Sequence, residues 1–460
     1  MTEQNPMGYK PIPKLLLTLT IPAIIANLTN ALYNIIDQIF IGQGIGYLGN
    51  AATNIAFPLS TICLAIALLI GLGSSATFSL ELGKGNIETS RKTVGTAAST
   101  ILVTGSVIAI LVIIFLKPLM LLFGATPEVL EYAMIYSGIT SIGIPFTILT
   151  SGMNQIIRSD GHARYAMASV IVGAILNIIL DYILIFPLNM GISGAAIATV
   201  ASQVTSALMV IAYLPRFEFV KLKMTDFIPD MKILASVFAL GLNGLIFQLG
   251  NVLIQIVSNN LLNIYGAASI YGSNIPIAVA GIVFKINVIF TTIIIGLYHG
   301  SQPIIGYSYG AKLYGRVRET FKLVLKIAVI VSVAFWLVFQ IFPSQIISLF
   351  GSGNELYMEF AVKYMRIFLF FVFINGVQIA CSNFFQAIGN AKKGIILSLS
   401  KQIILLLPLL VILPMFMGLD GIIYASPITD LIAFLLAIFL IYNELKKMPE
   451  DDVNVNTTTD

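Results

Sequence analysis

Charged residues are scarce in this sequence. Lys, Arg, Asp and Glu together make up 10% of the 460 residues, whereas a soluble globular domain carries roughly 25%. Hydrophobic residues make up 58% of the chain, which is more apolar surface than a soluble core could bury. The sequence therefore excludes an ordinary soluble protein and predicts an all-α polytopic membrane protein, whose apolar side chains are solvated by the lipid bilayer.

Residues that build catalytic and metal sites are also few. The two cysteines, Cys63 and Cys381, lie in apolar stretches, and the only histidines are His162 and His299. The sequence therefore offers few residues from which a disulfide framework, a metal site or a Ser-His-Asp triad could be built. No G-x-x-x-x-G-K-[ST] motif is present, and the G-x-S-x-G pattern at 306–310 ends a predicted membrane helix instead of following a strand. No basic face suits nucleic acid. We expect no enzyme, no cofactor and no nucleic-acid partner.

Apolar segments long enough to cross the hydrocarbon core, which takes about 20 helical residues, recur along the chain. We predict spans at residues 15–41, 51–73, 93–116, 129–152, 165–186, 192–214, 232–262, 274–298, 319–342, 361–381, 394–416 and 421–442. Lys and Arg gather in alternate loops, with Lys117 as the main exception. The positive-inside rule then places both termini in the cytoplasm of a multi-pass plasma-membrane protein.

The second half of the sequence repeats the first at an offset of about 227 residues. Gly83 falls on Gly310 and Arg91 on Arg318. Because six spans is an even number, the halves share one orientation, and we expect a parallel repeat with a pseudo-two-fold axis along the membrane normal. The predicted fold has twelve transmembrane helices in two homologous six-helix lobes, a plan typical of secondary transporters.

The repeat and the spans also predict where the parts of the chain begin and end. We expect a cytoplasmic N-terminus at 1–14, an N-terminal lobe at 15–214 and a basic cytoplasmic linker at 215–231. A C-terminal lobe at 232–442 and a disordered cytoplasmic tail at 443–460 complete the chain. The two fused halves make a monomer sufficient, and a monomer is the expected state.

Polar residues inside the first-half spans mark a candidate site. One face of the first span carries polar side chains at spacings of three and four residues, namely Asn27, Asn30, Asn34 and Asp37. On the fifth span, Asp181 lies one turn beyond Asn177. A charge at mid-bilayer costs about 3 kcal/mol or more. The pattern predicts a cation or proton site shared by both helices; a structural hydrogen-bond network is the alternative.

The second-half spans carry amides and a lysine instead. Asn251, Gln255 and Ser258 share a face of the seventh span, and the tenth carries Asn375, Gln378 and Ser382. Such amides are typical of hydrogen bonds between membrane helices. Lys285, in the eighth span, is the only clear cation that we expect at mid-membrane, and it either lines a cavity or pairs with an acid. Asp430 lies in the twelfth span without an assigned role.

The sequence resembles a known family, the bacterial branch of the multidrug and toxic compound extrusion (MATE) transporters, over roughly residues 10–445. The segments that carry the resemblance are YNIIDQIFIG at 33–42, QIIRSDG at 155–161, Asn177 to Asp181, and Gln302-Pro303 followed by Tyr309 to Lys312. Together they are specific, although each alone is weak. The resemblance implies a two-lobe antiporter that exports lipophilic organic cations, including drugs, in exchange for H⁺ or Na⁺.

The resemblance also suggests which residues carry the transport. We expect the coupling cation at Asp37 and Asp181, with Asn177 and Asn34 in support, and Asp37, Asp181 and Asn177 as the place for Na⁺; no other metal is expected. We expect the substrate cavity at Asn30, Tyr33, Asn154, Gln255, Lys285, Asn375 and Gln378. Some members of the family carry acids in the seventh and tenth helices, where this sequence has amides, so coupling through the second lobe is not expected.

Two other functions fit part of the pattern. A lipid-linked oligosaccharide flippase of the related superfamily shares the architecture, but flippases of anionic lipids tend to need several basic residues in the cavity, and Lys285 is the only one expected there. A membrane-embedded enzyme would need a nucleophile with a base, or metal ligands, for which the spans offer no set of residues.

Overall fold

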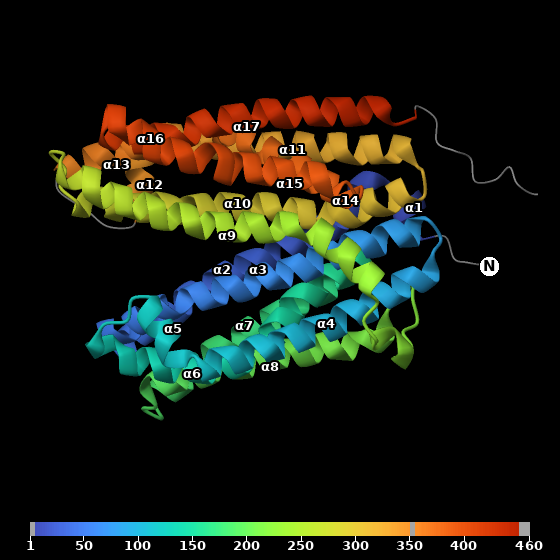
Figure 1. Cartoon of the computed structure of the whole chain (residues 1–460), viewed down its shortest axis with the longest axis horizontal. Coiled ribbons are helices and arrows are strands. Elements are labelled where there is room, and N and C mark those ends of the chain that lie inside the picture. The colour runs from blue at the N-terminus through green and yellow to red at the C-terminus, as the bar shows by residue number, and fades with distance from the viewer. Residues whose placement is uncertain (1–4, 350–354, 450–460) are drawn as a thin grey trace, which may run out of the picture. The chain divides into compact units, whose positions relative to one another are not determined.

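A computed structural model of the protein describes residues 5–349 and 355–449, and within these residues it is helical with no strand. The helices of the first half are α1 (Pro6–Tyr9), α2 (Ile12–Gly44), α3 (Tyr47–Gly83), α4 (Ile87–Ile114), α5 (Leu116–Leu122), α6 (Pro127–Ser159), α7 (Ala163–Ile185), α8 (Gly191–Tyr213), η1 (Leu214–Arg216) and η2 (Met224–Phe227) (Figure 1). Those of the second half are α9 (Met231–Ala267), α10 (Asn274–Gly310), α11 (Tyr314–Ile341), α12 (Pro343–Ser348), α13 (Glu355–Phe368), α14 (Val372–Ala387), α15 (Ala391–Leu399), η3 (Ser400–Leu406), α16 (Leu407–Met417) and α17 (Leu419–Lys447).

The number of membrane spans agrees with the sequence. In the described part of the chain, ten helices are long and apolar enough to cross a membrane, and two bent pairs raise the number to twelve. One bend, of 53°, lies within α6 between Ile142 and Ile144, where Pro145 follows directly and removes a helical hydrogen bond. The other, of 43°, separates α13 from α14. The prediction of a twelve-span, all-α membrane protein is confirmed.

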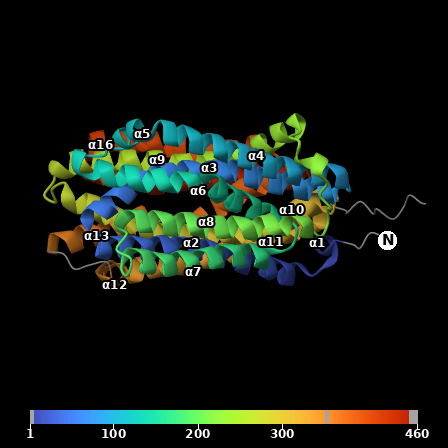
Figure 2. The same cartoon turned by 90° about the horizontal axis from the view of Figure 1, so that it is seen from below.

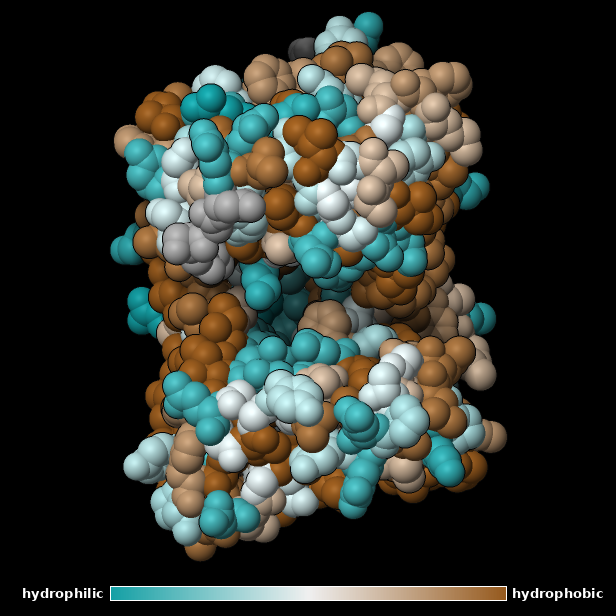
Figure 3. Space-filling model, turned by 90° about the vertical axis from the view of Figure 1, so that its left-hand side faces the viewer, coloured by the Kyte–Doolittle hydropathy of each residue, from teal (hydrophilic) through white to brown (hydrophobic). Residues whose placement is uncertain are grey.

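Large apolar side chains remain on the outside of the helices. Figure 3 shows them in brown, gathered on the flanks of the face in view. Examples from α4 and α17 are Ile110, Ile114, Leu435 and Phe439, which are all exposed. Apolar surface of this extent marks contact with a membrane or a partner. Together with the span lengths, it indicates that lipid covers these faces.

Contacts divide the chain into two compact units. Unit 1 comprises Met1–Leu245 and His299–Ala311, and unit 2 comprises Ile246–Tyr298 and Lys312–Asp460. Within unit 1, the main hydrophobic core joins α3, α4 and α6, whose fully buried members include Phe78, Ile101, Ile148 and Met153. In the same unit, α7 packs against both α2 and α8 (Figure 2). The segment expected to be a linker, 215–231, lies within unit 1.

A buried aspartate fastens this linker to α4. Asp226 of η2 forms an ion pair with Arg91, with 2.8 Å between Nε and the carboxylate. The backbone N–H of Lys223 donates to the same carboxylate at 2.6 Å. Since a carboxylate that is buried and fully bonded holds its partners strongly, the linker is ordered on the surface of unit 1. Residues 443–447 of the expected tail belong instead to α17, and the residues after 449 lie outside the described part of the chain.

A second buried aspartate, Asp160 in the α6–α7 loop, fastens the same segment from the other side. Its carboxylate accepts hydrogen bonds from the Tyr213 hydroxyl at 2.7 Å and from the backbone N–H of Glu218 at 2.9 Å. Asp160 also raises the pKa of the neighbouring His162 imidazole, chiefly through a hydrogen bond to the carboxylate. The loop and the linker therefore form one polar network at this end of unit 1.

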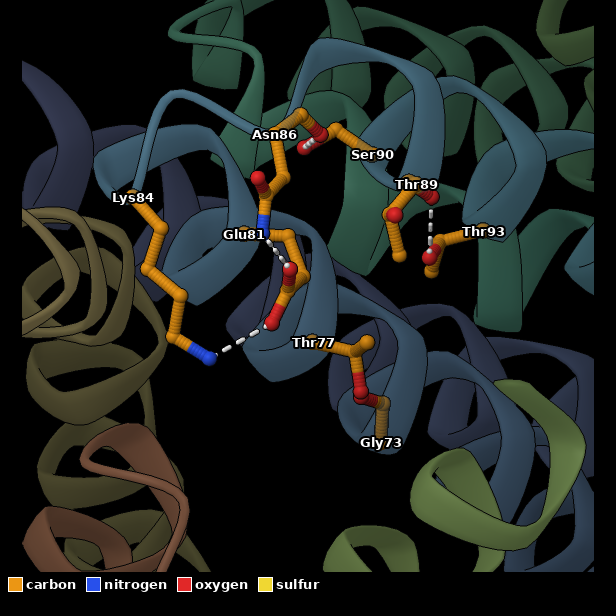
Figure 4. A network of polar contacts seen from close by, with 8 residues as sticks. All are labelled: Gly73, Thr77, Glu81, Lys84, Asn86, Thr89, Ser90 and Thr93. Carbon is orange, nitrogen blue, oxygen red and sulfur yellow. Dashed lines mark hydrogen bonds and ion pairs between the residues drawn. The ribbon is translucent and has the colours of Figure 1, made fainter. Parts of the chain in front are cut away.

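The turn from α3 to α4 is fixed by side chains of its own. Glu81 accepts hydrogen bonds from Lys84 Nζ and Asn86 Nδ2, both at 2.7 Å, and Ser90 Oγ donates to the Asn86 carbonyl at 3.1 Å (Figure 4). Gly85 between them has a φ of 80°, a conformation that glycine adopts without strain. The tight turn keeps α3 and α4 side by side, as their mutual packing requires.

Glycine allows α3 and α9 to cross in backbone contact within unit 1. A Cβ placed on Gly241 would lie 1.7 Å from the Leu69 carbonyl oxygen, and one on Gly73 would lie 1.9 Å from that of Val237. We expect Gly241→Ala to lower the free energy of unfolding by about 1–3 kcal/mol or more, because the backbones must separate. Thermal unfolding in detergent would measure the loss.

The matched control is Gly281→Ala on α10, where a Cβ meets no atom within 4 Å. Alanine is the better helix former there, so this variant should unfold at the wild-type temperature or slightly above it. Equal unfolding temperatures for the two variants would show that the crossing tolerates a methyl group.

Candidate functional site

Two acidic side chains meet where α2 and α7 pack together in unit 1. Asp37 of α2 is 8% exposed, and Asp181 of α7 is 0% exposed. Their carboxyl groups lie near enough to interact electrostatically. Asn177, one turn before Asp181, is 1% exposed. The structure thus brings together three of the four residues expected to bind the coupling cation.

The pair has almost no bonding partner among the described residues. Asp37 Oδ1, both carboxylate oxygens of Asp181 and both side-chain polar atoms of Asn177 are buried without a hydrogen bond from any described residue. No basic side chain of the described residues acts on either carboxyl group. Two neighbouring buried carboxylates repel each other and lack solvation, so they need a proton or a metal cation between them. Carboxylate and amide oxygens suit both H⁺ and Na⁺.

Aromatic and aliphatic side chains surround the acidic pair. Tyr33 of α2 and Tyr136 of α6 lie near enough to interact electrostatically with Asp37. One turn beyond the pair, Ile41 and Ile185 pack together in a small apolar cluster that Phe40 and Tyr136 extend. The two isoleucines therefore lie one turn closer to the ends of α2 and α7 than the carboxyl groups do.

The remaining first-half candidates differ in their exposure and in their hydrogen-bond partners. Asn30 and Asn34 are exposed, and Asn34 Nδ2 donates to the Asn30 carbonyl within its own helix at 2.7 Å. Asn154, in contrast, is buried, and its Oδ1 accepts a hydrogen bond from Ser169 Oγ at 3.1 Å. In this conformation Asn154 joins α6 to α7 and does not line open space.

Unit 2 contains an ion pair that the sequence analysis missed. Lys401 Nζ lies 3.0 Å from Asp430 Oδ1, with side chains that are only 16% and 6% exposed. Lys401 also donates to Asn375 Oδ1 of α14. Lys285 is therefore not the only lysine within the spans, and the expectation of a single mid-membrane cation was wrong. Lys401 lies in the eleventh predicted span, 394–416, so a count of charges within the spans would have found it.

The backbone around Lys401 is a π-helix, η3, in which the Leu407 N–H bonds five residues back to the Gln402 carbonyl. Pro408 follows and supplies no N–H of its own. Gln402 is buried and donates to Asn251 Oδ1 of α9 at 3.2 Å. Its Oε1 would lie 1.8 Å from a Cβ on Gly250. Consecutive side chains of η3 thus bond to α9, α14 and α17 within unit 2.

The other second-half candidates do not converge on one point. Gln255 and Lys285 are exposed, and among the described residues Lys285 has no ion pair. Gln378 is buried. Asn251 and Asn375 act as hydrogen-bond acceptors that join helices, as amides in membrane helices commonly do. No group of three or more His, Cys, Asp or Glu side chains in the described part of the chain could hold a metal ion.

Comparison with known proteins finds one family over both halves of the chain. The MatE family model matches residues 22–183 and 249–412. A curated relative, the multidrug export protein MepA of Staphylococcus haemolyticus (strain JCSC1435), is 26% identical over 448 residues, which cover 96% of each chain. Asp37 and the Asn177–Asp181 pair lie within the first matched segment, and Lys401 lies within the second.

Solved structures agree with the fold. The structure of the MATE multidrug transporter DinF-BH has a TM-score of 0.88 and 35% identity, and the match covers 96% of this chain and 98% of that one. A multidrug resistance MATE family transporter in an outward-facing conformation also gives a TM-score of 0.88, at 24% identity over 96% of this chain and 100% of that one. The predicted fold of two homologous lobes is confirmed by this likeness.

Proposed function

This chain belongs to the MatE family, and from that premise we propose that it is a secondary active multidrug efflux transporter, which exports lipophilic organic cations in exchange for H⁺ or Na⁺. The observation that carries the proposal is the pair of buried carboxyl groups, Asp37 and Asp181, which has no basic partner among the described residues and of which three oxygens, Asp37 Oδ1 and both of Asp181, accept no hydrogen bond from them. The names of the relatives, a multidrug export protein and a multidrug transporter, support the class of substrate.

The chemistry of exchange follows from competition for one negative charge. When H⁺ or Na⁺ binds between Asp37 and Asp181, with Asn177 Oδ1 as a further ligand for Na⁺, the site no longer attracts an organic cation. When the coupling ion leaves, the carboxylates again attract a positively charged substrate. A membrane potential of 100 mV supplies about 2.3 kcal/mol per charge, and each pH unit supplies about 1.4 kcal/mol. Either gradient suffices for modest uphill export.

Alternating access completes the proposal. In secondary transporters with repeated halves, rocking of one repeat against the other exposes a central site to each side of the membrane in turn. We propose that Asn30, Tyr33, Asn154, Gln255, Lys285, Asn375 and Gln378 contribute to the substrate path in one or more of these states. Phe40, Ile41 and Ile185 would move when the acidic pair becomes accessible from its own end of the helices.

The oligomeric state, the location and the partners of the protein follow from the proposed transport function. We propose a monomer in the plasma membrane with both termini in the cytoplasm, since basic residues occupy the loops on that side. Its partners would be the lipid bilayer and small lipophilic cations. It would catalyse no chemical reaction and hold no resident cofactor, because transport of this kind draws its energy from an ion gradient.

The flippase alternative gains no support from the newly found lysine. Lys401 is only 16% exposed and its charge is matched by Asp430, so it is not free to bind an anionic lipid headgroup. Lys285, Lys322 and Lys326 are exposed in membrane-spanning helices of unit 2 without an ion pair among the described residues. Lys401 adds no free cation to this set, so the case for binding a lipid-linked diphosphate is no stronger than it was from the sequence.

Transport of ethidium in proteoliposomes tests the proposal. A proton gradient and a sodium gradient are imposed separately on the purified, reconstituted chain. We expect ethidium movement driven by one or both gradients and absent from protein-free liposomes. No movement under either gradient, together with movement of a labelled lipid-linked oligosaccharide, would replace the proposal with the flippase.

A further inference from the structure

An arginine is buried in unit 1 away from the acidic pair. Arg158, one residue before the end of α6, is 3% exposed. Its Nη1 donates to Gln155 Oε1 at 2.8 Å and lies 3.4 Å from Nδ1 of His299, a residue of α10 that belongs to the same unit. His299 is buried as well. Three polar side chains from two helices, Gln155, Arg158 and His299, thus form a buried cationic cluster.

No carboxylate of the described residues pairs with this guanidinium. Arg158 Nε is buried without an acceptor, and no described residue accepts a hydrogen bond from Nη2. The neighbouring acid, Asp160, is directed elsewhere, since it accepts from Tyr213 and from the backbone of Glu218. Arg158 therefore keeps donors free on the side of the guanidinium that carries Nε and Nη2.

His299 cannot supply the missing negative charge. Arginine nitrogens only donate, so Nδ1 of His299 faces Arg158 as an acceptor and the imidazole proton is on Nε2. The imidazole is then neutral. A guanidinium remains charged at any pH a cell reaches, and a buried charge without a counterion destabilises the folded protein. The cluster as it stands has one uncompensated positive charge.

We propose that Gln155, Arg158 and His299 form a binding site for a small monovalent anion such as chloride, which bonds to Nε and Nη2 of Arg158. One negative charge balances the single guanidinium, whereas a phosphate would bring more charge than the described cluster can neutralise. Two N–H groups on one edge of a guanidinium are a common anion-binding arrangement. The bound anion would neutralise the buried positive charge of Arg158.

The site is separate from the cation-coupling pair. Arg158 lies just before the loop that starts α7, whereas Asp181 follows Ala163, the first residue of α7, by 18 residues, a rise of roughly 27 Å along the helix. The anion site therefore does not depend on the proposed transport function. Its occupancy can be measured by binding or by stability, in protein that transports nothing.

Thermal unfolding of the full-length protein in detergent tests the site. Sodium concentration and ionic strength are held constant while chloride replaces gluconate, so that a sodium effect at Asp37 and Asp181 cannot contribute. We expect the unfolding temperature of the wild type to rise with chloride and to saturate, by about 5 °C at a hundred times Kd. Equal unfolding temperatures in the two salts would overturn the proposal.

The variants separate this site from general salt effects. In Arg158→Gln the chloride-dependent rise should vanish, whereas Arg91→Gln, which loses the ion pair with Asp226, should unfold earlier but keep the full rise. A chloride response retained by Arg158→Gln would contradict the assignment. Should Arg158→Gln fail to fold, saturable binding of radioactive chloride to the wild type, with one anion per chain, decides the matter; absence of saturable binding overturns the site.

Discussion

Asp181→Asn should reduce gradient-driven ethidium transport in proteoliposomes to the level of protein-free liposomes. Asparagine has nearly the same size and can occupy the same space between α2 and α7, but it cannot take up and release a positive charge. In the wild type, both Asp181 oxygens lack a hydrogen-bond donor among the described residues and the carboxyl group of Asp37 lies beside them. The coupling ion would lose its main ligand, and every step that follows its binding would stop.

The same substitution should leave the protein folded. Removing one of two neighbouring buried carboxylates relieves repulsion and lowers the cost of desolvation, so the unfolding temperature should stay equal or rise. Asp420→Asn is the matched control, because that aspartate pairs with Lys363 at 2.6 Å and is 40% exposed, and its loss should leave transport intact. Undiminished transport by Asp181→Asn, with its ion dependence unchanged, would remove Asp181 from the mechanism.

Single substitutions in the Lys401–Asp430 pair should destabilise the protein strongly. Lys401→Met leaves Asp430 buried without a counterion, and Asp430→Leu does the same to Lys401. Breaking a buried pair from one side typically costs about 3–5 kcal/mol. Each variant should therefore unfold well below the wild type in detergent.

The double variant Lys401→Met with Asp430→Leu gives the decisive comparison. With both charges gone, nothing buried remains uncompensated, and the unfolding temperature should recover most of the loss. A double-mutant cycle measures this recovery as the interaction energy between the two side chains. Additive losses in the cycle would mean that the two charges do not compensate each other in the folded protein.

The acidic pair could be predicted from the sequence because charged residues are rare in membrane helices. Asp37 and Asp181 are isolated acids in long apolar runs, and the resemblance named the same two positions. Helical spacing also placed Asn177 beside Asp181. Asn34 follows the same spacing and is exposed instead, which spacing alone could not show.

Other features of the structure could not be predicted from sequence patterns. The π-turn of η3 shifts the register of the helix, so a pattern with a period of 3.6 residues cannot show that Lys401 and Gln402 reach three different helices. Arg158 lies between the predicted spans 129–152 and 165–186, and only the packing of His299 against it reveals a buried charge. The contacts of Asp160 and Asp226 likewise join segments far apart in the chain.

Unit 1 includes a segment from the second half of the chain, and this has a consequence for biosynthesis. Its last segment, His299–Ala311, donates from Gln302 Nε2 to the Leu72 carbonyl at 3.3 Å and brings the Tyr307 carbonyl to 2.1 Å from where a Cβ of Gly83 would lie. A ribosome delivers that segment only after most of α10 has been made. A truncated product that stops after the first six spans would leave uncovered the ends of α3 and α6 that this segment contacts, and quality-control proteases should remove it quickly.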